Sequence, residues 1–302
     1  MIVPPYLKKG DTIGITCPAG YMPLENAQTC IDTLQAWGYK VIVGKTLGSG
    51  SQNYFSASDS ERTLELQAMM DDPSIHAILC GRGGYGMSRI IDQLSFKKLK
   101  KNPKWIIGFS DITVMHTHLF SQHKIASLHA PMAAAFNEDG FENEYIKSLR
   151  KALIGKKANY QYPAHPANKE GASTGKLIGG NLALLVHVIG TSSDFNTKNN
   201  ILFLEDIGEY LYNADRMLYQ LKRSNKLDKI SGLIFGGFTD MKDTVRPFGK
   251  TMEQILEELA ADLNIPVCFN FPVSHGKENV ALKIGVEYQL KVSKSKVQLK
   301  EL

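Results

Sequence analysis

The chain has 302 residues, of which 43% are hydrophobic and 22% are charged. This is the composition of an ordinary globular protein, and the length favours two domains at roughly 150 residues each. No apolar run approaches the ~20 residues that span a bilayer, and the N-terminus lacks the basic and apolar regions of a secretory signal. We therefore expect a cytoplasmic protein that does not bind a membrane.

Charge and cysteine content exclude two further classes. The net charge is +5, but the only dense basic run, Phe96–Trp105, has five lysines and no arginine. We interpret this run as a solvated helix end, because nucleic-acid binders concentrate their charge on one face. The four cysteines are widely spaced, without a CxxC pair or a Cys/His cluster. We therefore expect no nucleic-acid partner, no metal and no other cofactor.

The first half of the chain alternates short apolar runs with amphipathic stretches. This alternation predicts β-α-β units and a mostly parallel sheet in an N-terminal α/β domain, residues 1–156. Ser58 or Asp59 is the expected N-cap of its second helix. The expected strands are Thr12–Cys17, Lys40–Val43, His76–Cys80 and Trp105–Phe109, and the expected helices are Leu24–Trp37, Asp59–Asp71 and two that begin at Met87 and Asp111.

Residues 157–174 interrupt the pattern with two prolines, many small polar residues and no sustained period. We interpret them as a linker to a C-terminal α/β domain, residues 175–302. After residue 280, apolar and polar residues alternate with period two, which predicts antiparallel strands with one solvated face. The other expected elements of this domain are the strands Ile201–Glu205, Ile230–Phe235 and Pro266–Phe271 and helices from Asn181, near Tyr212–Arg223 and over Thr251–Leu263.

Three of the expected strands lead to a side chain with catalytic chemistry. Ser110 follows Trp105–Phe109, Glu205 ends a buried run, and His275 comes a few residues after Pro266–Phe271. Ligand sites of open α/β sheets lie beyond the carboxyl ends of the strands. Acyl transfer by a serine needs a base that takes its proton and a group that orients the base. We therefore consider Ser110 as nucleophile, His275 as base and Glu205 as orienting carboxylate.

Ser110 also has a plainer interpretation. Residues 108–111 have the shape of a nucleophile elbow, although Ile112 stands where G-x-S-x-G has its second glycine. An elbow would place Ser110 beside the N–H groups of a helix N-terminus, which suit an oxyanion. Serine is equally favoured as a simple N-cap of that helix, so both roles stay open.

Glu205 and His275 have plainer interpretations too. Glu205 stands beside Asp206 and fits a solvated acidic loop, although a carboxylate that ends an apolar run should be half-buried and need a partner. His275 fits an ordinary loop histidine. His129, which ends another short apolar run, is the alternative base.

The glycine-rich turn after His76–Cys80 contains G-x-G-x-x-G as Gly81, Gly83 and Gly86. A dinucleotide site also needs an acidic residue at the end of the next strand, and that strand leads to Ser110 instead. The turn is also not in the first β-α unit, where that fingerprint normally lies. We therefore interpret it as a loop that brings backbone N–H groups close to a reacting carbonyl oxygen.

Across nearly its whole length the chain resembles the LD-carboxypeptidase family of serine peptidases. The resemblance implies a parallel-sheet N-terminal domain and a C-terminal α/β domain with more antiparallel strands. It implies a triad of Ser110, Glu205 and His275, and an oxyanion hole made by the N–H groups of Asp111 and Gly84. The motifs that carry it are PPYLKKGDTIGITCPAG, GRGGYG, IIGFSDIT, LHAPM, LFLEDIGE and FPVSHGKENVALKIG.

The resemblance also implies an activity. Members of the family are cytosolic homodimers that remove the terminal D-alanine of murein tetrapeptides, cutting an L-D bond during cell-wall recycling. The triad is split between the two expected domains, so the cleft is expected between them. Arg82 is a candidate for binding the substrate carboxylate, or else a plain surface arginine. Two alternatives stay open: a microcin-immunity peptidase that cuts a peptidyl-nucleotide, and a non-catalytic binding module on the same fold.

Overall fold

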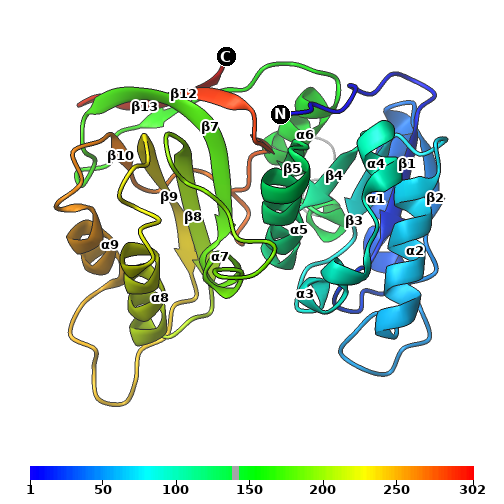
Figure 1. Ribbon diagram of the computed structural model, residues 1–302, viewed down its shortest axis with the longest axis horizontal. Helices are drawn as coiled ribbons and strands as arrows, with labels where there is room; N and C mark the ends of the chain where they lie inside the picture. Colours follow the sequence, from blue (N-terminus) through cyan, green and yellow to red (C-terminus); the bar gives the residue numbers. More distant parts are fainter. Residues whose placement is uncertain (138–142) are drawn as a thin grey trace. The chain divides into compact units, whose positions relative to one another are not determined.

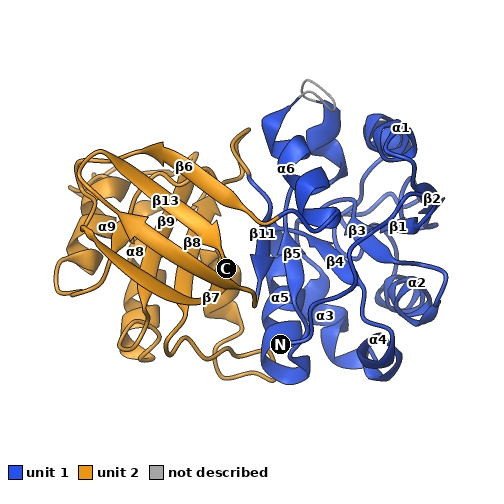
Figure 2. Ribbon diagram, turned by 90° about the horizontal axis from the view of Figure 1, so that it is seen from above, with its two compact units in different colours: residues 1–156, 280–284 blue, residues 157–279, 285–302 orange. Residues whose placement is uncertain are grey.

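The computed structural model describes residues 1–137 and 143–302. The chain forms two compact units, each built from one β-sheet with helices, which confirms the predicted α/β class (Figure 1). Unit 1 comprises Met1–Lys156 together with Val280–Ile284, and unit 2 comprises Lys157–Asn279 together with Gly285–Leu302. Figure 2 colours the two units separately.

Unit 1 contains a six-stranded sheet with the strand order β11-β5-β4-β3-β1-β2. Strands β1 to β5 run parallel, as the alternation of strands and helices predicts. Its strands are β1 (Thr12–Thr16), β2 (Lys40–Val43), β3 (Ala77–Cys80), β4 (Trp105–Gly108), β5 (Ser127–His129) and β11 (Leu282–Ile284). Its helices are η1 (Leu24–Ala27), α1 (Gln28–Ala36), α2 (Asp59–Asp71), α3 (Met87–Ile90), η2 (Ile91–Gln93), α4 (Lys97–Lys101), η3 (Ser110–Ile112), α5 (Thr113–His118), η4 (Leu119–His123), η5 (Ala133–Asn137) and α6 (Glu144–Leu153).

Strand β11 corrects the predicted domain boundary, because it belongs to unit 1 although it follows most of unit 2 in the chain. It lies beside β5 in unit 1 (Figure 2) and pairs antiparallel with it. In this pairing Leu282 lies opposite His129. The buried Lys283 of this strand donates to the Tyr6 hydroxyl at 3.4 Å and to the Lys156 carbonyl at 3.5 Å. The period-two pattern predicts a strand here but not its partner, because the pairing joins segments about 150 residues apart.

Unit 2 contains a seven-stranded sheet with the order β10-β9-β8-β7-β12-β13-β6. Strands β7 to β10 run parallel, whereas β12, β13 and β6 add antiparallel pairs. The sequence predicts antiparallel strands at β12 and β13, whereas β6 lies in the expected linker. Its strands are β6 (Asn159–Pro163), β7 (Gly171–Asn181), β8 (Ile201–Ile207), β9 (Gly232–Thr239), β10 (Val267–Cys268), β12 (Glu287–Val292) and β13 (Lys296–Glu301). Its helices are α7 (Leu182–His187), α8 (Leu211–Arg223) and α9 (Met252–Ala260).

The predicted linker, residues 157–174, is only partly irregular. It contains the edge strand β6, which pairs with β13, and the first residues of β7, which pair with β12. Half of its residues face solvent on this outer part of the sheet, so polar side chains and Pro163 at the end of β6 are tolerated. The sequence of a polar edge strand resembles that of a linker, because the strand is stabilised by pairing with its neighbours in the sheet and not by an apolar pattern of its own.

None of the helices in the described residues is long and apolar enough to cross a lipid bilayer.

Candidate active site

Ser110 lies where β4 turns into η3, and its backbone has a φ of 61°. A left-handed φ is unusual outside glycine, asparagine and aspartate, and such strained positions cluster at functional sites. The N-cap of η3 is Phe109, whose backbone is extended, and not Ser110. The structure therefore gives Ser110 the backbone of a nucleophile elbow, and the plainer N-cap interpretation loses its support.

The glycine-rich turn passes directly against Ser110. A Cβ added to Gly83 would lie 2.8 Å from the Cβ of Ser110 and 3.0 Å from its Oγ, so only glycine permits this approach. The Gly83 carbonyl accepts a hydrogen bond from Gly20 N at 3.0 Å. In a trans peptide the next N–H points the opposite way, so the N–H of Gly84 points away from Gly20. The Gly83 backbone therefore lies against Ser110 and close to the backbone N of Asp111, which is 3.4 Å from the same Cβ position.

Arg82 and Cys17 lie beside the same turn. The Arg82 guanidinium donates to the Tyr21 carbonyl at 2.7 Å, which uses one of its five N–H donors, and the side chain is exposed. A Cβ on Gly81 would lie 2.8 Å from the Cys17 sulfur. Burial raises the pKa of Cys17 to about 12, so its thiol stays protonated and does not compete with Ser110 as a nucleophile.

Two buried histidines, His116 on α5 and His129 on β5, lie next to Gly108 at the end of β4. His116 Nε2 lies 2.8 Å from the Gly108 carbonyl, which can only accept, so Nε2 carries the proton and Nδ1 accepts from the Ser127 hydroxyl at 2.8 Å. Burial lowers the pKa of His116 to about 4, which keeps the ring neutral. His129, the alternative base, is fully buried with its ring against Phe109 and His116.

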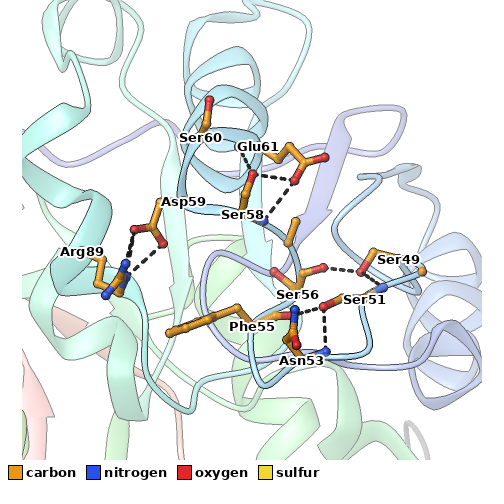
Figure 3. Close-up of a pocket in the computed structure, with 12 residues that line it drawn as sticks. Ser49, Ser51, Asn53, Phe55, Ser56, Ser58, Asp59, Ser60, Glu61 and Arg89 are labelled. Atoms are coloured by element: carbon orange, nitrogen blue, oxygen red, sulfur yellow. Dashed lines mark hydrogen bonds and ion pairs between the residues drawn. The ribbon is translucent and has the colours of Figure 1, made fainter.

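A polar pocket of about 750 Å³ opens in unit 1 at the N-terminus of α2. Figure 3 shows Asp59 and Arg89 facing each other on one side of it, with Arg89 Nη2 at 2.7 Å from Asp59 Oδ2. Ser58 and Glu61 form a capping box, as the expected N-cap requires. The pocket is lined by Ser49, Gly50, Ser51, Asn53, Phe55, Ser56, Ala57, Ser58, Asp59, Ser60, Glu61 and Arg89. Several of these side chains hydrogen-bond to one another or to nearby backbone, so the polar lining of the pocket is held in a fixed arrangement.

Unit 2 brings Glu205 and His275 together. Glu205 is fully buried on β8, and its Oε2 lies 2.6 Å from His275 Nδ1. A carboxylate accepts, so Nδ1 donates and the neutral imidazole keeps Nε2 as its acceptor. The other oxygen, Oε1, has no hydrogen-bond partner in the described part of the chain. This is the carboxylate–histidine pair that a general base requires, and it rules out the solvated-loop interpretation of Glu205.

The pKa of His275 is raised above its usual value. Burial acts to lower it, but the hydrogen bond and charge of Glu205, together with the charge of Asp206, outweigh burial because they stabilise the imidazolium. Asp206 is itself buried, and burial raises its pKa to about 6. Its carboxylate accepts from Asn181 Nδ2 at 2.7 Å and from Ala183 N at 3.0 Å, which fixes the end of β7 to β8.

A diglycine bulge in β9 lets the His275 loop pack against Glu205. Leu204 pairs with Phe235 and Asp206 with Phe238, so Glu205 alone lies opposite Gly236 and Gly237. A Cβ on Gly236 would lie 2.2 Å from the Val273 carbonyl oxygen and 3.2 Å from the Glu205 Cβ. Gly237 N donates to the same carbonyl at 2.9 Å. The bulge therefore sets the distance between the histidine loop and the carboxylate.

Gly236→Ala should displace the histidine loop, because its new methyl group would collide with the Val273 backbone. A shift of about 1 Å costs on the order of 10²-fold in kcat. Turnover and the thermal midpoint should be compared with those of Gly50→Ala, an exposed glycine with open space around it. Equal turnover by the two variants would show that the bulge does not position His275.

Two family models match the chain: the LD-carboxypeptidase N-terminal domain over residues 13–130 and the LD-carboxypeptidase C-terminal domain over residues 174–290. The chain is also 32% identical to the probable murein peptide carboxypeptidase of Bacillus subtilis, over 94% of this chain and 90% of that protein. The chain belongs to the LD-carboxypeptidase family.

Two of the solved structures that resemble this chain share its fold. The muramoyltetrapeptide carboxypeptidase of Oxalobacter formigenes superposes with a TM-score of 0.87 at 30% identity, covering 96% of this chain and 98% of that one. The microcin C7 self-immunity protein MccF, in complex with aspartyl sulfamoyl adenosine, superposes with a TM-score of 0.86 over 100% of this chain and 99% of that one. Its identity is 24%, so this likeness concerns the fold alone.

Sequence reasoning missed three features of this LD-carboxypeptidase. The Gly236–Gly237 pair had a usable signal, because two glycines inside a strand indicate a bulge or a close backbone approach. Asp206 carried only the weaker signal of a second carboxylate after a buried run. Arg62 on α2 had none, since an arginine in a helix is usually exposed. Among the described residues, no group of three His, Cys, Asp or Glu side chains is placed to hold a metal ion.

Proposed function

We propose that this LD-carboxypeptidase is a serine enzyme that releases the terminal D-alanine of murein tetrapeptides by cutting an L-D peptide bond. The buried hydrogen bond of 2.6 Å between Glu205 and His275 carries the proposal, because it prepares a base with a fixed tautomer. The strained φ of 61° at Ser110 supplies the matching nucleophile turn. The murein peptides in the names of related carboxypeptidases support the substrate.

In the proposed reaction, His275 Nε2 takes the proton of Ser110 as Oγ attacks the carbonyl of the L-residue. The N–H groups of Asp111 and Gly84 stabilise the oxyanion, with about 3 kcal/mol for each donor. The C–N bond breaks, His275 returns its proton to the amine, and D-alanine leaves. Water then hydrolyses the acyl-enzyme with His275 again as base. The mechanism requires Ser110 Oγ and His275 Nε2 to come within about 2.6–3.2 Å of each other in the active enzyme.

A terminal D-residue carries a free carboxylate, and Arg82 is our candidate for binding it. Its remaining guanidinium donors and the N–H groups of the glycine-rich turn suit a carboxylate. A site built for that charge rejects amides and longer peptides, because they leave its polar groups unpaired. In line with the family resemblance, we place the reaction in cell-wall recycling in the cytoplasm, with a homodimer as the working form.

The test is to incubate the protein with a murein tetrapeptide, its all-L counterpart and the pentapeptide, and to measure released alanine by chiral chromatography. We expect D-alanine from the tetrapeptide alone, and none when Ser110→Ala replaces the wild type. Equal release from the all-L peptide would contradict the proposed L-D specificity. Turnover of a peptidyl-nucleotide without D-alanine release would instead assign a microcin-immunity activity, and no turnover of either would indicate a binding module.

A further inference from the structure

One peptide group of the glycine-rich turn, between Gly86 and Met87, is bound on both sides by buried charged side chains. The Gly86 carbonyl accepts from Arg62 Nη1 at 3.2 Å, and the Met87 N–H donates to Asp111 Oδ2 at 2.7 Å. The side chain of Arg62 and the whole of Asp111 have no exposed surface. A cation on the C=O and an anion on the N–H of the same rigid plane fix its orientation.

Arg62 is held in this position by contacts with three other residues. Its guanidinium donates to the Pro18 carbonyl, to the Ala57 carbonyl and to the Asp59 carboxylate. A buried guanidinium is tolerated only with such a complete set of partners. A Cβ on Gly86 would lie 2.6 Å from Arg62 Nη1, so glycine is needed for the contact. Arg62 thus joins the loop after β1, the start of α2 and the glycine-rich turn.

Asp111 connects the same peptide group to the nucleophile. It follows Ser110 directly, and burial raises the pKa of its carboxyl group to about 6, against the hydrogen bond from Met87 and the charge of Arg62. Its backbone N–H is one of the two proposed oxyanion donors, and the other, on Gly84, lies two residues before Gly86. Gly84 and Gly86 have φ values of 97° and 153°, so the intervening backbone has little intrinsic rigidity.

We infer that Arg62 and Asp111 are positioning residues that hold the N–H groups of Gly84 and Asp111 in the spacing that an oxyanion requires. The inference rests on the proposed function, since it assigns a role to that reaction's oxyanion hole. We call the two contacts, from Arg62 to the Gly86 carbonyl and from Met87 N–H to Asp111, the clamp. Weakening the clamp should lower turnover rather than ground-state substrate binding, because the oxyanion exists only near the transition state.

The experiment compares Asp111→Ala, Asp111→Asn and Arg62→Lys by kcat and KM for D-alanine release. Asp111→Ala should lower kcat on the order of 10²-fold, as loss of an oxyanion donor does, with KM changed only about twofold. Asp111→Asn should recover most of this loss, because its amide oxygen still accepts from Met87 N–H. Arg62→Lys keeps the charge but loses the planar fork that serves several carbonyls, so it should also lower kcat.

Arg89→Ala is the matched control. Arg89 pairs with the same Asp59 as Arg62, but its side chain is 46% exposed and its guanidinium donates to Asp59. Its backbone N–H donates to the Gly86 carbonyl at 3.1 Å, and a change to alanine leaves that bond in place. This variant should keep wild-type kcat. An Asp111→Asn enzyme as slow as Asp111→Ala would overturn the inference, because the carboxylate would then act through its charge. An Arg62→Lys enzyme with wild-type kcat would also overturn the inference, and this variant provides the test if Asp111→Ala does not fold.

A fluorophosphonate probe separates this inference from the proposed function. Ser110 Oγ forms a bond to phosphorus, the P–F bond breaks, fluoride leaves and the hydroxyl proton passes to the base, without any murein peptide. The wild type should be labelled at Ser110, and Asp111→Ala about 10²-fold more slowly, because the phosphoryl oxygen needs the same donors. No labelling of the wild type would contradict the serine mechanism itself. Equal labelling rates of wild type, Asp111→Ala and Arg62→Lys would overturn the clamp alone.

Discussion

Replacing either Ser110 or His275 with alanine should lower kcat for D-alanine release on the order of 10⁴–10⁶-fold, and the double variant should be hardly slower than either single one. The two residues serve one step, because Ser110 is a poor nucleophile until His275 takes its proton. Removal of one partner therefore removes the contribution of the other. Steady-state rates of chirally resolved D-alanine release, with purified variants of matched thermal midpoint, measure the effect.

His76 provides a matched control for the histidine. It also lies near a carboxylate, with Nε2 at 3.5 Å from Asp11 Oδ1, but its side chain is 44% exposed and belongs to unit 1. His76→Ala should keep wild-type kcat. His129→Asn tests the alternative base and should affect stability more than turnover, because the ring is fully buried. Additive losses for Ser110 and His275, or a greater loss at His129, would disprove the assignment.

The sequence predicts the parallel strands of both sheets for a physical reason. A parallel strand is buried on both faces, so it appears as a short, continuous apolar run between amphipathic helices. β4 and β8 are such strands. The polar residue that ends each run lies at the carboxyl edge of its sheet, which is why Ser110 and Glu205 stand out without a structure. The surroundings of these two residues cannot be predicted in this way, because the burial of Glu205 depends on residues that are distant from it in the chain.

Long-range pairing limits the rest of the prediction. Strand β11 has the same period-two pattern as β12 and β13, yet it pairs with β5 in unit 1. Periodicity reports which face of a strand is buried and contains no information on its partner. The same limit applies to Arg62, whose burial comes from carbonyl groups of Pro18 and Gly86 that a helical pattern does not reveal.

Glu205→Gln should lower kcat by up to about 10⁴-fold and move the acid limb of kcat/KM to lower pH. The base works as the neutral imidazole, so activity rises as pH increases through the pKa of His275. In the wild type that pKa is raised, because the hydrogen bond and charge of Glu205, with the charge of Asp206, outweigh burial. Glutamine removes the nearest charge and leaves burial to lower the pKa.

Asp206→Asn is the control that separates charge from orientation. It removes a second negative charge near His275. The amide oxygen of the new asparagine can still accept the hydrogen bond from Asn181 that joins β7 to β8. The acid limb should move in the same direction but less far, and kcat should fall much less, because the direct hydrogen bond of 2.6 Å from His275 to Glu205 remains. Rates measured over the pH range in which both variants stay folded give the limbs. If Glu205→Gln left the limb unchanged, the titrating group would not be His275, and the base would have to be sought elsewhere.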